Sequence, residues 1–388
     1  MWKPIVLVCL ANVLVTVHGH GATTYPPPRN AIDANEDPWR SPVPRKVPFE
    51  PWCPFPSAIA EITDPGRNLT GSNGQACFWF SNGCAIGCST CDGNTRGPIP
   101  SFEGDPLKPV PNHIDSGTGR PVAKEPVCDD GSTKATICDP SYRTVNTGAE
   151  CGSDDDFYYF SPWRRPGSAG VLDPCGVAGG RLPHQGAGAY GAVYQNTTHA
   201  KMGDQGSALP FTPGGVVWTA GDLVEVAWAI QANHGGGYAW RLCPASNDVV
   251  TEECFQSNHL DFEGSSIFRW GGVEGVSHAF APITITEGTT PPGSSWRKNP
   301  VPRAWRNPDG RWADASNHLQ TGEGFQPLCP NTENRTCTGM WGPYNLEIID
   351  RVRIPKTLEP GSYVLGWRWD CEESNQIWAS CSDVQIVR

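Results

Sequence analysis

Alternation of apolar and polar residues, with no helical repeat, dominates the second half of the chain. Two clear examples are residues 222–230 and 362–370. The apolar positions on one face of these segments are Val224, Val226, Trp228, Ile230, Tyr363, Leu365, Trp367 and Trp369. A two-residue period is typical of strands with one buried face. We therefore expect an all-β protein, an antiparallel β-sandwich of the immunoglobulin or fibronectin III type with long disulfide-pinned loops.

A glycine-rich segment follows the first alternating run. Residues 231–237 separate the run at 222–230 from a second short run at 238–243. Two strands around a Gly-rich loop favour a β-hairpin. His234 would then lie at the tip of that hairpin.

The first twenty residues are typical of a secretory signal. Lys3 supplies a positive charge, and the apolar run at 5–17 is too short to span a bilayer. Cleavage after Gly19 puts a small residue at position −1 and leaves His20 as the N-terminus. The alternative cut, two residues earlier, leaves His18 and places a larger valine at −1. We expect the first cut and a secreted, extracellular protein.

The remaining chain shows no internal repeat and no linker-like tract. Further strands are expected at 346–354 and 377–387. The segment 93–213 is rich in Gly, Pro, Asp and Asn with little periodicity, which favours long loops over a second core. A small independent domain there is the alternative. We expect a signal peptide at 1–19 and one domain over 20–388, with a loop-rich insertion around 93–213.

Cysteine usage agrees with export. Of 16 cysteines, one lies in the signal, which leaves 16 − 1 = 15. This number implies several disulfides and one odd cysteine, which is either a free thiol or paired elsewhere. The trio Cys84, Cys88 and Cys91 could bind zinc, but an oxidising compartment favours disulfides. Three sequons compatible with glycosylation begin at Asn68, Asn196 and Asn334.

The charge balance excludes two classes of partner. The formal net charge is −11, and removal of Lys3 makes it −11 − 1 = −12. Phosphate binding needs clustered Lys and Arg, so we expect neither a nucleic acid nor an anionic membrane as partner. A neutral polysaccharide is compatible with this charge.

Three features together indicate metal chemistry: the new N-terminal His20, His234 after a strand, and the polar and aromatic pair Gln376 and Trp378 near the C-terminus. A terminal histidine can bind a metal through its α-amino nitrogen and a ring nitrogen. The His234 imidazole would add a third nitrogen. Nitrogen donors in a T-shaped or tetragonal arrangement favour copper.

These residues lie in segments that resemble lytic polysaccharide monooxygenases of the chitin-active and animal-type families, the chitin-binding type-4 domain. His20-Gly21 followed by Pro-Pro-Pro and Arg29 resembles the family's opening. Arg29 falls nine residues after His20, as in the family, and eleven after His18, which supports the expected cleavage.

The family resemblance continues in the second half. Residues 228–234 resemble the strand that ends in a copper histidine, and residues 375–384 resemble the last strand. The resemblance covers both ends of the chain and the region around 216–245. It is thin through 93–213, where this chain carries more loop.

The resemblance implies copper-dependent oxidative cleavage of an insoluble β-1,4-linked polysaccharide, chitin or cellulose, at C1, C4 or both. It also implies a monomer that uses an external electron donor and O2 or hydrogen peroxide at a flat surface. His20 and His234 would hold copper, and Gln376 would hydrogen-bond an oxygen species. Trp378 stands where the family has an axial Tyr or Phe. Because an indole lacks a phenolic oxygen, Trp378 would only cover the axial side; the alternative is a core aromatic.

Other residues near these motifs are weaker candidates. Glu372 and Glu373 precede Gln376 and either approach the metal or are surface charges. His199 is the further histidine that could support the site. Tyr25 and Trp39 are candidates for contact with sugar rings. The histidines expected to be solvated or structural are His113, His184, His259, His278 and His318.

Two functions of other classes stay open. One is a non-catalytic secreted carbohydrate-binding or cell-wall protein that keeps the sandwich without redox chemistry. The other is a copper-binding protein that uses the same ligands without cleaving a glycan. A glycoside hydrolase would need two carboxylates at a set separation, which the sequence does not single out.

Overall fold

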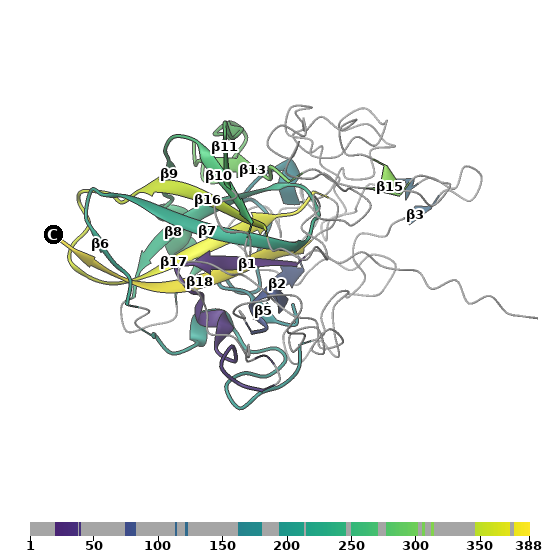
Figure 1. The fold of residues 1–388 in the computed structure, drawn as a ribbon, viewed down its shortest axis with the longest axis horizontal. Helices are drawn as coiled ribbons and strands as arrows, with labels where there is room; N and C mark the ends of the chain where they lie inside the picture. The colour runs from purple at the N-terminus through teal and green to yellow at the C-terminus, as the bar shows by residue number, and fades with distance from the viewer. Residues whose placement is uncertain are drawn as a thin grey trace, which may run out of the picture.

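The computed structural model describes residues 20–37, 39, 74–82, 113–114, 121–122, 162–180, 194–212, 215–245, 250–270, 277–301, 305–306, 312–313, 346–372 and 376–388. These residues form two main antiparallel sheets that pack as a β-sandwich (Figure 1). The all-β prediction is therefore confirmed. The cysteines at 84, 88 and 91, and most of the insertion at 93–213, lie outside the described residues.

The first sheet contains the strand that begins at the expected N-terminus. Its order is β1 (His20–Tyr25), β7 (Leu223–Ala232), β16 (Leu346–Arg353), β10 (Ser266–Trp270) and β11 (Ser277–Phe280), with β9 (Asp261–Phe262) also paired to β16. The strands predicted at 222–230 and 346–354 are thus confirmed as β7 and β16.

The second sheet contains the last two strands of the chain. Its order is β12 (Thr284–Ile285), β13 (Trp296–Lys298), β8 (Gly237–Pro244), β17 (Gly361–Asp370), β18 (Gln376–Val387), β2 (Trp79–Asn82) and β5 (Val177–Ala178). The short strand β6 (Val217–Thr219) runs parallel to β18. Two separate strand pairs are β3 (His113–Ile114) with β4 (Pro121–Val122), and β14 (Trp305–Arg306) with β15 (Trp312–Ala313).

The core lies between the two sheets and is rich in indole rings. All eight apolar residues that alternation assigned to one face belong to a single buried cluster. Within it, the Trp228 ring lies 5.0 Å from Trp367 and 5.5 Å from Trp369, measured between ring centroids. Burial of such large apolar surfaces supplies the main driving force for this fold.

The predicted hairpin at His234 is wrong. Strand β7 pairs with β1 and β16 in the first sheet, whereas β8 pairs with β13 and β17 in the second. Trp228 of β7 and Trp240 of β8 therefore reach the same core from opposite layers. Gly235 and Gly236, with φ of +62° and +77°, let the connecting loop turn between the layers. A Cβ on Gly236 would lie 2.0 Å from the backbone oxygen of Asp370, so a larger residue would clash there.

The outer face of the second sheet is covered by a short helix that the sequence did not reveal. Helix α2 (Glu252–Ser257) is capped at its N-terminus by Thr251, whose hydroxyl accepts a hydrogen bond from the Cys254 amide. With six residues, α2 is too short to show a helical apolar period. Its Phe255 packs on Gly366, where a Cβ would lie 2.7 Å from the phenyl ring.

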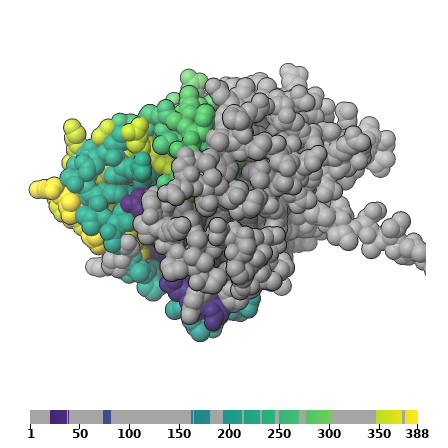
Figure 2. Space-filling model, viewed as in Figure 1, coloured from purple at the N-terminus to yellow at the C-terminus, as the bar shows by residue number. Residues whose placement is uncertain are grey.

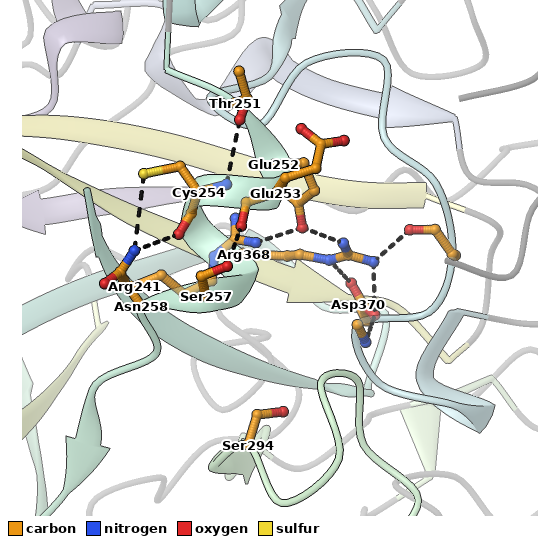
Figure 3. A network of polar contacts seen from close by, with 12 residues as sticks. Arg241, Thr251, Glu252, Glu253, Cys254, Ser257, Asn258, Ser294, Arg368 and Asp370 are labelled. Carbon is orange, nitrogen blue, oxygen red and sulfur yellow. Dashed lines mark hydrogen bonds and ion pairs between the residues drawn. The ribbon is translucent and has the colours of Figure 1, made fainter. Parts of the chain in front are cut away.

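A buried network of four charges joins α2 to β8 and β17: Glu252 of α2, Arg241 of β8, and Arg368 and Asp370 of β17. Glu252 accepts hydrogen bonds from Arg241 at 2.6 Å and from Arg368 at 2.9 Å. In Figure 3 the Arg368 guanidinium lies between Glu252 and Asp370. Its Nε donates a 2.7 Å hydrogen bond to the Asp370 carboxylate. Burial alone would raise the pKa of Glu252, but the two arginines outweigh burial and hold that pKa below its usual value.

Disulfides attach peripheral segments to the second sheet. Cys175 is bonded to Cys381 of β18, and Cys243 of β8 is bonded to Cys254 of α2. The first bond supports the expectation of disulfide-pinned loops. Asn196 of the second sequon is exposed on the loop before β6, whereas the sequons at 68 and 334 lie outside the described residues. Among the helices of the described residues, none is long and apolar enough to cross a membrane.

Candidate metal centre

The pairing of β1 with β7 brings the two candidate ligands to one end of the first sheet. His20 is the first residue of β1, and its Cα partner is Ala232, the last residue of β7. His234 follows two residues later. Since antiparallel pairing sets the start of one strand beside the end of the next, the backbone at His20 borders the loop that carries His234.

The residue after His20 packs directly on the tryptophan core. A Cβ built on Gly21 would lie 3.1 Å from Trp369, 3.2 Å from Trp367 and 3.1 Å from the Ala229 oxygen. These distances are tighter than ordinary van der Waals contact. Glycine at this position therefore lets the start of β1 approach the indole rings closely.

The backbone of the His234 loop is held from several directions. The Trp369 indole donates a 2.7 Å hydrogen bond to the Gly235 oxygen, and the Glu372 amide donates one of 3.1 Å to the His234 oxygen. The Asn233 side chain accepts a 2.9 Å bond from the Gly235 amide. His234 itself is only 5% exposed. The loop is thus fixed by the core beneath it.

A buried pair of opposite charges accompanies this loop. Glu372 is 1% exposed, so the surface-charge alternative is wrong for this residue, whereas Glu373 lies outside the described residues. Lys298 is also buried. Burial lowers the pKa of Lys298, and the Glu372 carboxylate opposes that shift. A lysine this close to the loop was not expected from the sequence.

Gln376 and Trp378 both belong to β18 and are buried. The Gln376 backbone oxygen accepts a 3.2 Å hydrogen bond from the Cys371 backbone amide. The adjacent Glu372 amide contacts the His234 oxygen, so Gln376 begins β18 at the same end of the sandwich as the His234 loop. Trp378 pairs across the strands with Trp369 and stacks on Phe80, with ring centroids 4.3 Å apart.

The Trp378 ring is fully buried in the core. This burial agrees with the alternative that it is a core aromatic. Its axial role therefore stays a prediction.

The other end of β18 faces away from this site. Figure 1 marks the C-terminus at the left-hand tip of the molecule, and Figure 2 shows yellow residues at that tip. Arg388, the last residue, is exposed and pairs with Glu359 at 2.5 Å. Gln376 and Val387 are the two ends of the twelve-residue strand. The candidate metal centre and this tip therefore lie at opposite ends of β18.

The secondary candidates have other environments. His199 pairs with Glu36, with 2.8 Å between Nε2 and the carboxylate oxygen. Tyr25 is half-buried, and Trp39 is 2% exposed, so the expectation that Trp39 contacts sugar rings is wrong. His113 lies in β3 and His278 in β11, whereas residues 184 and 318 lie outside the described residues.

His259 is a half-buried histidine, in line with the expectation that it is solvated or structural. Its two ring nitrogens are buried with no hydrogen-bond partner within the described part of the chain. Burial, aided by the nearby Arg241 and Arg368 charges, lowers the pKa of His259 to about 3. The imidazole is therefore neutral at physiological pH.

The residues at the end of β1 and β7 fit a copper ion by their donor chemistry. Two imidazoles and an α-amine are nitrogen donors, which copper prefers to the oxygen sets of magnesium or calcium. In the segments that the structure describes, no three His, Cys, Asp or Glu side chains form a metal-binding group. A site built from two histidines and a chain terminus contains only two such side chains. The pairing of His20 with Ala232 places the His20 backbone beside the end of β7, two residues before His234.

Comparisons with known proteins give weak likenesses. No protein-family model matches the chain. A chitin-binding domain from Burkholderia pseudomallei matches with a TM-score of 0.22 and 11% identity, over 44% of this chain and 56% of the other. The cellulose-active LPMO CelS2 in complex with copper matches with a TM-score of 0.21 and 13% identity, over 46% and 54%.

A family 123 glycoside hydrolase from Clostridium perfringens also matches, with a TM-score of 0.17 and 8% identity, over 45% of this chain and 23% of the other. The chain spans about half the length of the first two structures. At these scores the matches assign neither a family nor an activity to the chain.

Proposed function

We propose that this chain is a secreted copper-dependent enzyme that cleaves a β-1,4-linked polysaccharide, chitin or cellulose, by oxidation at C1, C4 or both. The observation that carries the proposal is the pairing of His20 with Ala232, two residues before His234. Strand β1 begins at the residue that signal cleavage would expose. A free amine and two imidazoles would then be available at one end of the sandwich.

Each residue has a distinct part in the proposal. His20, through its α-amine and ring, and His234, through its ring, would hold copper. Copper supplies one-electron redox chemistry towards O2 or hydrogen peroxide, fed by an external electron donor. Gln376 would hydrogen-bond O2 or hydrogen peroxide beside the metal, and Trp378 would limit access to the metal from the core side. The acidic net charge of the chain is compatible with a neutral glycan as substrate. We propose that the protein acts as a monomer.

The decisive experiment uses correctly processed protein that begins at His20. Copper affinity is measured by calorimetry, and soluble products from chitin and cellulose incubated with ascorbate are measured by mass spectrometry. We expect tight copper binding and oxidised oligosaccharides, both lost in His20→Ala and His234→Ala. A matched control retains extra residues before His20 and should lose both properties. Full activity of the extended protein would refute the proposal.

A second candidate is a carbohydrate-binding protein without redox chemistry. The burial of Trp378 against Phe80 favours it, because this ring already has a packing role in the core. Glycan binding that is unaffected by copper and by His234→Ala would support this candidate. Tight copper binding without oxidised products from either polymer would instead indicate a copper-binding protein.

A further inference from the structure

We infer that Asn299 is a positioning residue for the metal ligand His234, an inference that rests on the proposed copper function. Asn299 follows β13 and is fully buried. It belongs to a part of the chain with no resemblance to a metal motif, and it lies 299 − 234 = 65 positions from His234 in sequence. Its contacts nevertheless surround the His234 loop.

The Asn299 amide group joins both neighbours of His234. Its Nδ2 donates hydrogen bonds of 2.9 Å to the Asn233 side-chain oxygen and 3.2 Å to the Gly235 backbone oxygen. The Asn299 backbone amide donates a third, of 2.7 Å, to the Gly236 oxygen. One residue therefore fixes the positions immediately before and after the ligand.

Asn233 completes a closed arrangement of two amides. Its Nδ2 donates to the Val301 oxygen at 2.9 Å, and its oxygen also accepts from the Gly235 amide at 2.9 Å. The Asn299 oxygen in turn accepts from the Val301 amide at 3.0 Å. Both asparagines are fully buried, so each bond forms where water does not compete.

Only a side chain with both a donor and an acceptor satisfies this arrangement. Alanine at 299 would leave the buried oxygens of Asn233 and Gly235 without this donor. Aspartate would keep an acceptor for the Val301 amide but would set a carboxylate against those two oxygens. Since the loop contains two glycines and few intrinsic restraints, loss of the amide would let His234 adopt several positions.

The test measures copper rather than activity alone. Processed wild type, Asn299→Ala and Asn299→Asp are compared by copper affinity and by the Cu(II) electron paramagnetic resonance spectrum. We expect affinity to fall about 10–100-fold, the usual effect of residues that orient metal ligands. We also expect the spectrum to show altered or multiple copper environments. Circular dichroism and thermal melting establish that each variant is folded.

Asn258→Ala is the matched control. This asparagine also donates through Nδ2 to a backbone oxygen, that of Cys254 at 2.8 Å, but it lies at the end of α2. We expect it to lower stability and leave copper affinity and the spectrum unchanged. If Asn299→Ala does not fold, Asn299→Asp decides the question.

Two negative outcomes are distinguishable. Wild type that binds copper through His234, together with Asn299 variants of unchanged affinity and spectrum, would overturn the role of Asn299 alone. Wild type that binds no copper, or binds it equally after His234→Ala, would overturn the proposed function and this inference together.

Discussion

The Trp369 indole donates a 2.7 Å hydrogen bond to the backbone oxygen of Gly235, the residue after His234. The same ring lies against Gly21, the residue after His20. One core side chain therefore contacts a neighbour of each candidate ligand. The sandwich core and the candidate metal centre are parts of a single packed unit.

Trp369→Phe should weaken both the fold and the site. The change removes one of the two hydrogen bonds to the Gly235 oxygen, which also accepts from Asn299 at 3.2 Å, and the loss of one such bond costs about 0.5–1.5 kcal/mol. We expect lower stability in urea unfolding and lower copper affinity in calorimetry. Trp367→Phe is the control, because the Trp367 indole nitrogen has no hydrogen-bond partner among the described residues. Equal effects of the two changes on copper affinity would contradict the role of Trp369.

Gly21→Ala should disturb the start of β1. The added methyl group would press on Trp367, Trp369 and the Ala229 oxygen at 3.1–3.2 Å. Overpacking of this kind costs about 1–3 kcal/mol. We expect a lower melting temperature and weaker copper binding. Gly361→Ala provides the comparison, since a Cβ there meets nothing within 4 Å, and it should leave both measurements unchanged.

Glu252→Gln should destabilise the protein strongly. Glu252 is the shared partner of Arg241 and Arg368, so its neutralisation leaves buried positive charge uncompensated. Removal of one partner from a buried ion pair costs about 3–5 kcal/mol. Chemical denaturation measures the loss. Glu263→Gln breaks the exposed pair with Arg353 and should change stability little. A small effect at Glu252 would mean that the network is not essential.

Stability should fall as the pH is lowered below 6.5, partly because of His259. Its folded pKa of about 3 lies below the usual 6.5, so its stabilising contribution is complete above pH 6.5. As the pH falls towards 3, the unfolded chain binds a proton that the folded chain does not, at about 1.4 kcal/mol per pH unit.

His259→Phe should flatten this part of the pH profile, because phenylalanine does not titrate and the buried ring nitrogens make no hydrogen bond with the described residues. Unfolding curves between pH 7 and 5 give the comparison. Identical slopes for the two proteins would rule out a contribution from His259.

The strands could be predicted because their evidence is local. Alternation identified β7 and β17 together with the buried face that each presents, and strand-like sequence identified β16 and β18. The sequence of a single strand does not indicate which of the two sheets the strand joins. The run 231–237 has the composition of a hairpin loop, yet its two flanking strands, β7 and β8, belong to different sheets and contribute side chains to the same core.

In the candidate site, too, some residues have local sequence signals and others are identified only by tertiary contacts. His20 and His234 could be selected from their positions in the sequence, because a new chain terminus and a strand end have recognisable signals. Asn299 and Lys298 could not, since their contacts depend on how β13 pairs with β8. Alternation assigned Trp369 to the core but gave no sign of its bond to Gly235.

The loop from Asn233 to Gly236 is the seam at which the chain passes from one sheet to the other. His20 belongs to the first sheet, while the restraints on His234 come largely from residues in or beside the second, Trp369, Glu372 and Asn299. If His20 and His234 hold copper as proposed, a bound ion would stabilise the folded arrangement of both sheets, and the melting temperature should rise with copper concentration.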